Sequence, residues 1–93
     1  MRPPLTADSA VVFGGGGGIG AAVSEELAHT HDVVVGYHHN HRRAQSVVDK
    51  INAGGETAIA CGADATTADG VDTPLSAAEE LGPLRTVVHC VGA

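Results

Sequence analysis

Apolar residues follow two patterns along this chain, and the two patterns alternate. Short, nearly continuous apolar runs occupy residues 9–13, 32–37, 57–61 and 86–91. Runs of this length that are rich in β-branched and small residues predict strands buried on both faces. Between the runs, apolar residues recur every three or four positions, which predicts amphipathic helices.

Three segments have this helical spacing. The apolar positions are Ile19, Ala22, Val23 and Leu27 in the first segment, Ala44, Val47, Val48 and Ile51 in the second, and Val71, Leu75, Ala78 and Leu81 in the third. Asn40 precedes the second stripe and is predicted to cap that helix. Residues 64–70 are predicted to form a turn-rich connection before the third helix, with Pro74 in the first turn of that helix.

The predicted elements therefore alternate as strand, helix, strand, helix, strand, helix and strand. Each connection is long enough for a right-handed crossover between parallel strands. The pattern predicts an α/β fold with one parallel sheet, in a single partial domain of residues 1–93. Residues 1–8, which include Pro3 and Pro4, are predicted to be a leader before the first strand.

Composition and charge restrict the possible partners. Only 2% of the residues are aromatic, so valine, isoleucine, leucine and alanine have to fill the core. Five basic residues against eleven acidic ones give a formal charge of −6, which argues against binding to nucleic acids or to anionic membranes. No segment has the length of a signal peptide or a membrane span, and a cytoplasmic location is therefore expected.

Neither the cysteines nor the histidines have the spacing of a metal site. Cys61 and Cys90 are far apart in the sequence, which favours reduced thiols over a disulfide or a redox pair. His38, His39 and His41 lie in one turn, without cysteine or carboxylate residues at ligand spacing. No physiological metal site is predicted.

The run GGGGGIG at residues 14–20, between the first predicted strand and the first helix, is the most informative motif. Backbone N–H groups without side chains can approach an anion closely, and the helix dipole also favours negative charge there. The run fits two dinucleotide-binding spacings, G-x-G-x-x-G at Gly15, Gly17 and Gly20 and G-x-x-x-G-x-G at Gly14, Gly18 and Gly20. It predicts a loop that binds a pyrophosphate, the alternative being a flexible linker.

With the second spacing, four segments resemble the short-chain dehydrogenase/reductase family. GGGGGIG is similar to its T-G-x-x-x-G-I-G loop, VVVGYHHN to its second strand and cofactor-selecting turn, CGADATT to its A-D-V-T segment and VVHCVGA to its V-N-N-A-G-I stretch. Gly17 stands where the family often has arginine or lysine. The resemblance implies an incomplete Rossmann fold, a doubly wound parallel sheet of about four strands and three helices with strand order 3-2-1-4.

The turn after the second predicted strand indicates which dinucleotide is preferred. An acidic residue there would bind the ribose hydroxyls of NAD. Tyr37, His38 and His39 take that place, and Arg42 and Arg43 follow in the next helix. The sequence therefore favours NADP over NAD, with His38 where NADP-binding relatives often have arginine. The alternative is that these histidines are only polar residues of a surface turn.

The resemblance implies roles for residues after the third and fourth strands. Asp64 would hydrogen-bond the adenine amino group beside Ala65, and Cys90 would pass near the adenine ribose. From the residues alone, Asp64 also fits a turn-capping aspartate and Cys90 a buried packing residue. The predicted cofactor-binding residues are Gly14, Gly16, Gly17, Gly18, Ile19, Gly20, Tyr37, His38, His39, Asp64, Ala65, Cys90, Val91 and Gly92.

The resemblance implies hydride transfer between a nicotinamide and a carbonyl or alcohol carbon, with a serine and a Tyr-x-x-x-Lys pair beyond the fourth strand. Tyr37 and Lys50, the chain's single tyrosine and lysine, do not have that spacing, so no catalytic residue is predicted and the catalytic half is expected to be absent. The sequence is interpreted as the N-terminal part of an NAD(P)-dependent oxidoreductase, for example one acting on a 3-oxoacyl thioester. The alternatives are a non-catalytic nucleotide-binding remnant, one piece of a split reductase, and an unrelated methyltransferase.

The fourth predicted strand also indicates a protein partner. Residues 87–91 are apolar except for His89, and no further strand is predicted to cover them. An open apolar edge invites pairing with another strand. Self-association, or association with a complementing chain, is therefore expected through this edge.

Overall fold

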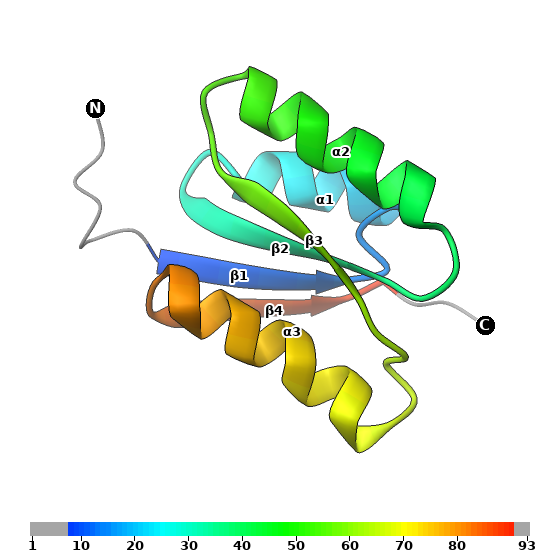
Figure 1. Ribbon diagram of the computed structural model, residues 1–93. Coiled ribbons are helices and arrows are strands. Elements are labelled where there is room, and N and C mark those ends of the chain that lie inside the picture. The colour runs from blue at the N-terminus through cyan, green and yellow to red at the C-terminus, as the bar shows by residue number, and fades with distance from the viewer. Residues whose placement is uncertain (1–7, 91–93) are drawn as a thin grey trace.

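The computed structural model describes residues 8–90 and contains the predicted alternation of strands and helices (Figure 1). The elements are β1 (Asp8–Phe13), α1 (Gly18–Leu27), β2 (His31–Tyr37), α2 (His41–Ala53), β3 (Ala58–Gly62), α3 (Ala68–Leu81) and β4 (Leu84–His89). All neighbouring strands are parallel, and their order is β3-β2-β1-β4. The predicted fold class and strand order are therefore confirmed.

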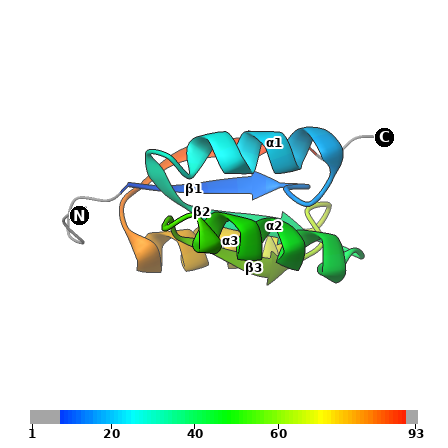
Figure 2. The same ribbon diagram turned by 90° about the horizontal axis from the view of Figure 1, so that it is seen from above.

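The sheet is covered by helices on both faces. Helices α1 and α2 pack on one face and α3 packs on the other (Figures 1 and 2). Alternate residues of the central strands enter the two cores: Val12 and Val35 lie in the core under α1 and α2, whereas Val11 and Val34 lie in the core under α3. Because both faces of β1 and β2 are buried, these strands are the fixed frame from which the loops at their carboxyl ends project.

Helix α1 packs on the sheet through small residues, and the predicted stripe on this helix was partly wrong. Gly20 and Ser24 are its buried residues, whereas Ile19 is 78% exposed and Ala22 is exposed. The physical reason is the close approach of Gly20 to the preceding loop, where a Cβ atom would overlap the carbonyl oxygen of Gly14. This approach turns Ile19 outward, at the start of the helix.

Helix α3 begins earlier than the sequence pattern predicted. It starts at Ala68, and the Oγ1 atom of Thr67 caps it by accepting a hydrogen bond from the backbone N–H of Gly70 (3.0 Å). The cap brings the last part of the predicted connection at residues 64–70 into the helix. Pro74 therefore lies inside α3 and not in its first turn, so that prediction was wrong.

Strand β4 is the edge of the sheet on the side of β1. Within residues 8–90, no strand pairs with its other edge, and its side chains alternate between half-buried and exposed. Val87 is 51% exposed. The strand ends at His89, before the predicted end at residue 91, which lies outside the described residues. At the other end of the chain, Asp8 belongs to β1, and the rest of the predicted leader is likewise outside that range.

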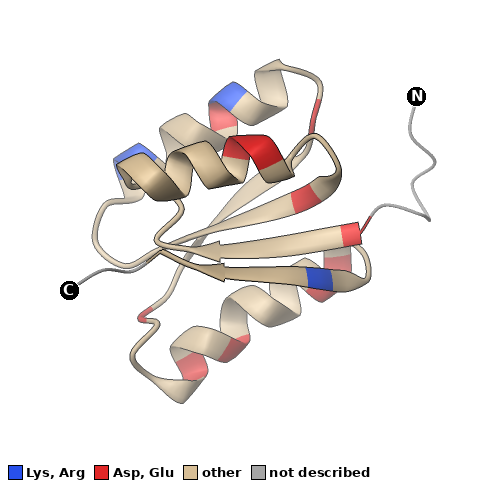
Figure 3. Cartoon of the chain, turned by 180° about the vertical axis from the view of Figure 1, so that it is seen from behind, with Lys and Arg blue, Asp and Glu red and all other residues tan. Residues whose placement is uncertain are grey.

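Acidic residues are spread along the chain, whereas the lysine and arginine residues of the described part lie in α2 and β4 (Figure 3). The Nζ atom of Lys50 lies 3.1 Å from Oε1 of Glu25, and the Nε atom of Arg85 lies 3.5 Å from Oδ1 of Asp8. No carboxylate of residues 8–90 forms an ion pair with Arg43, at the start of α2.

In the same range, none of the helices combines the length and the hydropathy that crossing a membrane requires.

Candidate functional site

The segment that we call the glycine loop, residues 14–17, connects the carboxyl end of β1 to α1. Gly14 has a φ of 76°, a backbone conformation that residues other than glycine rarely adopt. The backbone N–H groups of Gly14 and Gly15 both donate to the carbonyl oxygen of Gly36, at 3.0 and 3.1 Å. These bonds fix the loop against the end of β2, at the edge of the sheet where doubly wound folds bind ligands.

Helix α1 starts without a side-chain cap, unlike the other two helices. Asn40 caps α2 and Thr67 caps α3, whereas Gly17, at the N-cap of α1, has no side chain to do so. Within the described part of the chain, the first backbone N–H of this helix that finds an acceptor is that of Ala21, which donates to the Gly17 oxygen (2.6 Å). The backbone N–H groups of the helix residues before Ala21, together with the helix dipole, are therefore available to an anion.

The positions of the glycine run differ in why they require glycine. A Cβ atom on Gly15 would lie 2.9 Å from Oγ of Ser24, and one on Gly16 would lie 2.9 Å from the backbone nitrogen of Ala44, so internal packing leaves little room at either position. A Cβ atom on Gly18 would meet nothing within 4 Å. The chain's own packing thus does not require glycine at residue 18. A pyrophosphate approaching the start of α1 does require it, so the residues present fit such a group.

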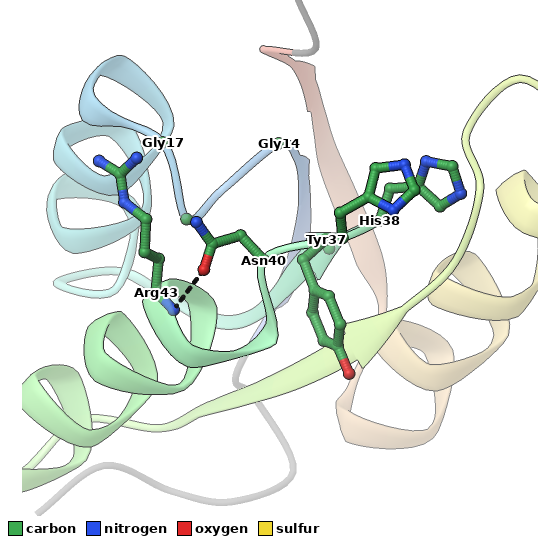
Figure 4. A pocket seen from close by; sticks show the side chains of 9 residues that line it. Gly14, Gly17, Tyr37, His38, Asn40 and Arg43 are labelled. Carbon is green, nitrogen blue, oxygen red and sulfur yellow. Dashed lines mark hydrogen bonds between the residues drawn. The ribbon is translucent and has the colours of Figure 1, made fainter.

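Two cavities lie on either side of the end of β2. The first, which we call the loop cavity, has a volume of about 220 Å³ and is lined by Gly14, Gly16, Gly17, Gly36, Tyr37, His38, His39, Asn40 and Arg43 (Figure 4). The second, which we call the aspartate cavity, has a volume of about 160 Å³ and is lined by Phe13, Gly14, Gly36, Tyr37, His38, Ala63, Asp64, Ala65 and Thr66. Gly14, Gly36, Tyr37 and His38 line both, so the two cavities adjoin.

The side chain of Tyr37 points away from the glycine loop, towards β3 (Figure 4). A Cβ atom on Gly62 would lie 2.9 Å from the phenol oxygen of Tyr37, so the two residues are closely packed. The phenol ring also contacts the imidazole of His41, with 5.2 Å between the ring centroids. The side chain of Tyr37 is therefore directed away from the loop cavity, and a ligand bound there would meet the neighbouring side chains of the turn first.

Asp64 uses one of its carboxylate oxygens to close a turn. Its Oδ1 atom accepts hydrogen bonds from Oγ1 (2.6 Å) and from the backbone N–H (2.9 Å) of Thr66, and the first of these bonds is the main reason why the pKa of Asp64 is lowered from 3.8. The charged form is thus stabilised in the folded chain, and this contribution is present above pH 3.8 and lost as the pH falls through the lowered pKa. The Oδ2 atom lies 3.7 Å from Nε2 of His38.

The remaining predicted site residues lie at the same edge of the sheet, or outside the described residues. The backbone N–H of Cys90 donates to the Phe13 oxygen (2.8 Å), and its side chain packs against the core under α1 and α2. Val91 and Gly92 fall outside residues 8–90. Within that range, no group of three or more histidine, cysteine or acidic side chains is placed to hold a metal ion.

Three residues of the loop cavity were not assigned to the site from the sequence, namely Gly36, Asn40 and Arg43, and Arg43 is the charged one. The sequence suggested it only as a nearby cation. The structure places its guanidinium beside Gly17, across the cavity from His38 (Figure 4). This position follows from the contact of Gly16 with the backbone of Ala44, which brings the first turn of α2 against the loop. Sequence spacing gives no signal for such a contact.

Comparison with known proteins agrees with the geometry. The family model of the short chain dehydrogenases matches residues 8–93. Hydroxynaphthalene reductase of Aspergillus fumigatus is 41% identical over 71 residues, which are 75% of this chain and 26% of that protein. Glycine betaine reductase of Emericella nidulans is 37% identical over 92 residues, which are 98% of this chain and 7% of that protein.

Solved structures give the same result. A dehydrogenase/reductase from Sinorhizobium meliloti is 33% identical with a TM-score of 0.83, covering 95% of this chain and 35% of its own. A short chain dehydrogenase from Mycobacterium avium is 30% identical with a TM-score of 0.83, covering 98% of this chain and 35% of its own. The chain thus spans about a quarter of the reductase from Aspergillus fumigatus and about a third of these two structures. On the family match and the shared fold, this chain belongs to the short-chain dehydrogenase family.

Proposed function

We propose that this chain forms the adenosine-diphosphate half of an NAD(P)-binding site, with NADP preferred, in a short-chain oxidoreductase. The observation that carries the proposal is the start of α1, which is uncapped and has open space at Gly18. It lies at the carboxyl end of β1, beside the turn after β2. The backbone N–H groups of the first turn of α1, together with that of Gly16, would hold the pyrophosphate there, since those of Gly14, Gly15 and Gly17 are used within the loop and by Gly36.

Arg43 supports the preference for NADP. Its guanidinium faces the glycine loop beside Gly17, the position where the family often has a basic residue (Figure 4). A guanidinium can bind a phosphate through two parallel hydrogen bonds. Among the described residues that line the loop cavity, none is acidic, so no carboxylate of the lining would contact a 2′-phosphate there. We therefore assign the 2′-phosphate to Arg43, with His38 and His39 on the other side.

The aspartate cavity is proposed to hold the adenine ring. Ala63 and Ala65 give it apolar walls, and Phe13 lies at its base, 3% exposed. The Oδ1 atom of Asp64 is engaged by Thr66, which leaves Oδ2 to accept a hydrogen bond from the adenine amino group. The closing of the turn and the binding of adenine are therefore compatible roles of one carboxylate.

The proposed reaction of the complete enzyme is reduction of a carbonyl or oxidation of an alcohol, including a 3-oxoacyl thioester as one substrate class. The cofactor would supply or accept the hydride, and the residues of this chain would bind and orient it. Tyr37 packs against Gly62 and Lys50 pairs with Glu25, so neither is placed as a catalytic acid or base. This observation favours a second candidate function, nucleotide binding without catalysis, for the chain by itself.

Calorimetric titration with NADP, NAD and 2′,5′-ADP tests the proposal. Arg43→Gln is expected to weaken binding of NADP and 2′,5′-ADP by about tenfold, the effect of losing one charge-assisted phosphate contact, and to leave NAD binding nearly unchanged. Arg42→Gln is the matched control, because Arg42 faces a separate hollow on the outer side of α2. No saturation of the wild-type chain by any of the three ligands would refute the proposed site.

We also propose that the free edge of β4 is covered by the remainder of a short-chain dehydrogenase, on the same or on a second polypeptide. The relatives are longer, and Val87 is 51% exposed on a strand that lacks a second neighbour among residues 8–90. The isolated 93-residue chain is then expected to self-associate in sedimentation velocity, and Val87→Lys to shift it towards monomer. A monodisperse wild-type monomer that melts cooperatively would contradict this expectation.

A further inference from the structure

We infer that His38 makes the preference of this site for NADP over NAD dependent on pH. The protonated imidazole favours the 2′-phosphate, and loss of its proton weakens that preference. This inference rests on the proposed function, because it concerns the same site. It adds a specificity-determining histidine, the side-chain type that ordinarily changes charge between pH 5 and 8.

The geometry places His38 between the two cavities. It lines both the loop cavity and the aspartate cavity, and its side chain is 50% exposed. Its Nε2 atom lies 3.7 Å from Oδ2 of Asp64, and its ring contacts that of His39 in a tilted arrangement, with 3.8 Å between centroids. A ligand that joins the glycine loop to the aspartate cavity therefore passes this imidazole.

The charged and titratable groups around His38 come from three other elements as well as its own turn. The carboxylate of Asp64 faces it from the loop after β3, Arg43 faces the same cavity from α2, the start of α1 contributes the positive end of its dipole, and His39 adjoins it. Asp64 is charged at neutral pH, since the pKa of an aspartate is about 3.8 and the hydrogen bonds from Thr66 lower it further, and an arginine stays protonated. Among the side-chain types of this set, only histidine ordinarily changes charge between pH 5 and 8.

The sign of the effect follows from the charge of Asp64. With a neutral His38, the charge of the Asp64 carboxylate, 3.7 Å away in the adjoining aspartate cavity, is not offset by the imidazole and opposes a phosphate dianion in the loop cavity. With a protonated His38, that charge is offset and the imidazole can donate a hydrogen bond to the phosphate. Binding of NADP is therefore expected to draw a proton onto the chain, whereas binding of NAD, which has no 2′-phosphate, is not.

Ionisation of the 2′-phosphate has the opposite effect on binding as the pH rises. The experiment therefore has to separate the phosphate's protons from those of the imidazole. A phosphate monoester loses its second proton near pH 6, so its dianion gains population as the pH rises. At pH 7.5 that ionisation is nearly complete, whereas a typical histidine is still mostly neutral. Proton uptake measured at pH 7.5 thus reports on the imidazole and not on the phosphate.

The test is isothermal titration calorimetry of the full chain at pH 7.5, in two buffers that differ in ionisation enthalpy and contain no phosphate. NADP binding is expected to take up a fraction of a proton and NAD binding none. The NADP preference of the wild-type chain should also fall by about fivefold between pH 6.5 and 8.5. His38→Gln should abolish the uptake and the fall in preference.

His29→Gln is the matched control. His29 is also an exposed histidine beside a carboxylate, with its Nδ1 atom 3.0 Å from Oε2 of Glu56, but it follows α1 at the opposite end of the sheet. It should leave the proton uptake unchanged. Equal uptake with NADP and NAD, or uptake that persists in His38→Gln, would overturn the inference while the proposed function stands. If neither dinucleotide binds at any pH, the proposed function fails and the inference with it.

Discussion

Gly18→Val is expected to abolish dinucleotide binding while the chain still folds. Space is available at this position, since a Cβ atom on Gly18 would meet nothing within 4 Å. The same space is where a pyrophosphate would approach the uncapped start of α1. A branched side chain there would hold the phosphates away from the backbone N–H groups and remove most of their stabilisation. We expect affinity for NADP to fall by at least about 100-fold, which corresponds to about 2.7 kcal/mol.

Calorimetry and circular dichroism together check this expectation. Ala22→Val is the matched control, because Ala22 is exposed on the same helix, one turn beyond the glycine loop. It adds a similar bulk without blocking the first turn. Retained NADP affinity in Gly18→Val, within about threefold of the wild type, would mean that no anion binds at the start of α1.

Gly20→Ala is expected to destabilise the fold strongly. Its Cβ atom would overlap the carbonyl oxygen of Gly14 and crowd the Cα atom of Gly15, both of which are backbone atoms that cannot rotate away. Either α1 has to move off the sheet or the glycine loop has to change its turn. Overpacking of this kind costs about 3 kcal/mol, a large part of the 5–15 kcal/mol that stabilises a typical domain.

Urea denaturation followed by circular dichroism, at a fixed protein concentration, measures this loss. Gly18→Ala serves as the comparison, because it makes the same chemical change where there is room for it. The two substitutions are expected to differ by about 3 kcal/mol in the free energy of unfolding. A Gly20→Ala chain as stable as Gly18→Ala would show that α1 does not pack closely on the loop.

The sequence predicted the fold well because its central strands have no other way to be buried. Val11, Val12 and residues 33–35 are all apolar, and such runs fit only strands that are covered on both faces. The cap at Asn40 was also predicted correctly, and its Oδ1 atom accepts from the backbone N–H of Arg43 (3.2 Å). These features depend on residues close in sequence, where periodicity and capping chemistry are informative.

The errors occurred where long-range contacts override local preference. Ile19 was counted as part of the buried stripe of α1, but the packing of Gly20 on the loop turns it outward. Thr67 was taken as part of a loop, although it caps α3, which begins at Ala68, and this early start places Pro74 beyond the first turn. Neither contact has a periodic signal in the sequence.

The candidate site could be predicted by position more readily than by role. Parallel strands end at one edge of the sheet, so the glycine loop, the turn at Tyr37 and the segment at Asp64 had to come together there. The use of the Asp64 oxygens and the direction of Arg43 depend on side-chain geometry that spacing does not encode. The cofactor roles of these residues stay predictions until binding is measured.

The position of β1 in the middle of the sheet has a consequence for biosynthesis. The hydroxyl of Ser9, near the start of β1, donates to the oxygen of Gly82 (3.0 Å), a residue 73 positions later in the chain, and Ser9 itself pairs with Leu84. A ribosome that has already released β1, α1 and β2 has yet to synthesise the strand that completes their sheet. The edge of β1 that pairs with β4 thus lacks its partner through most of translation, and we expect the closing of the sheet to be slow because the two strands are far apart in the sequence.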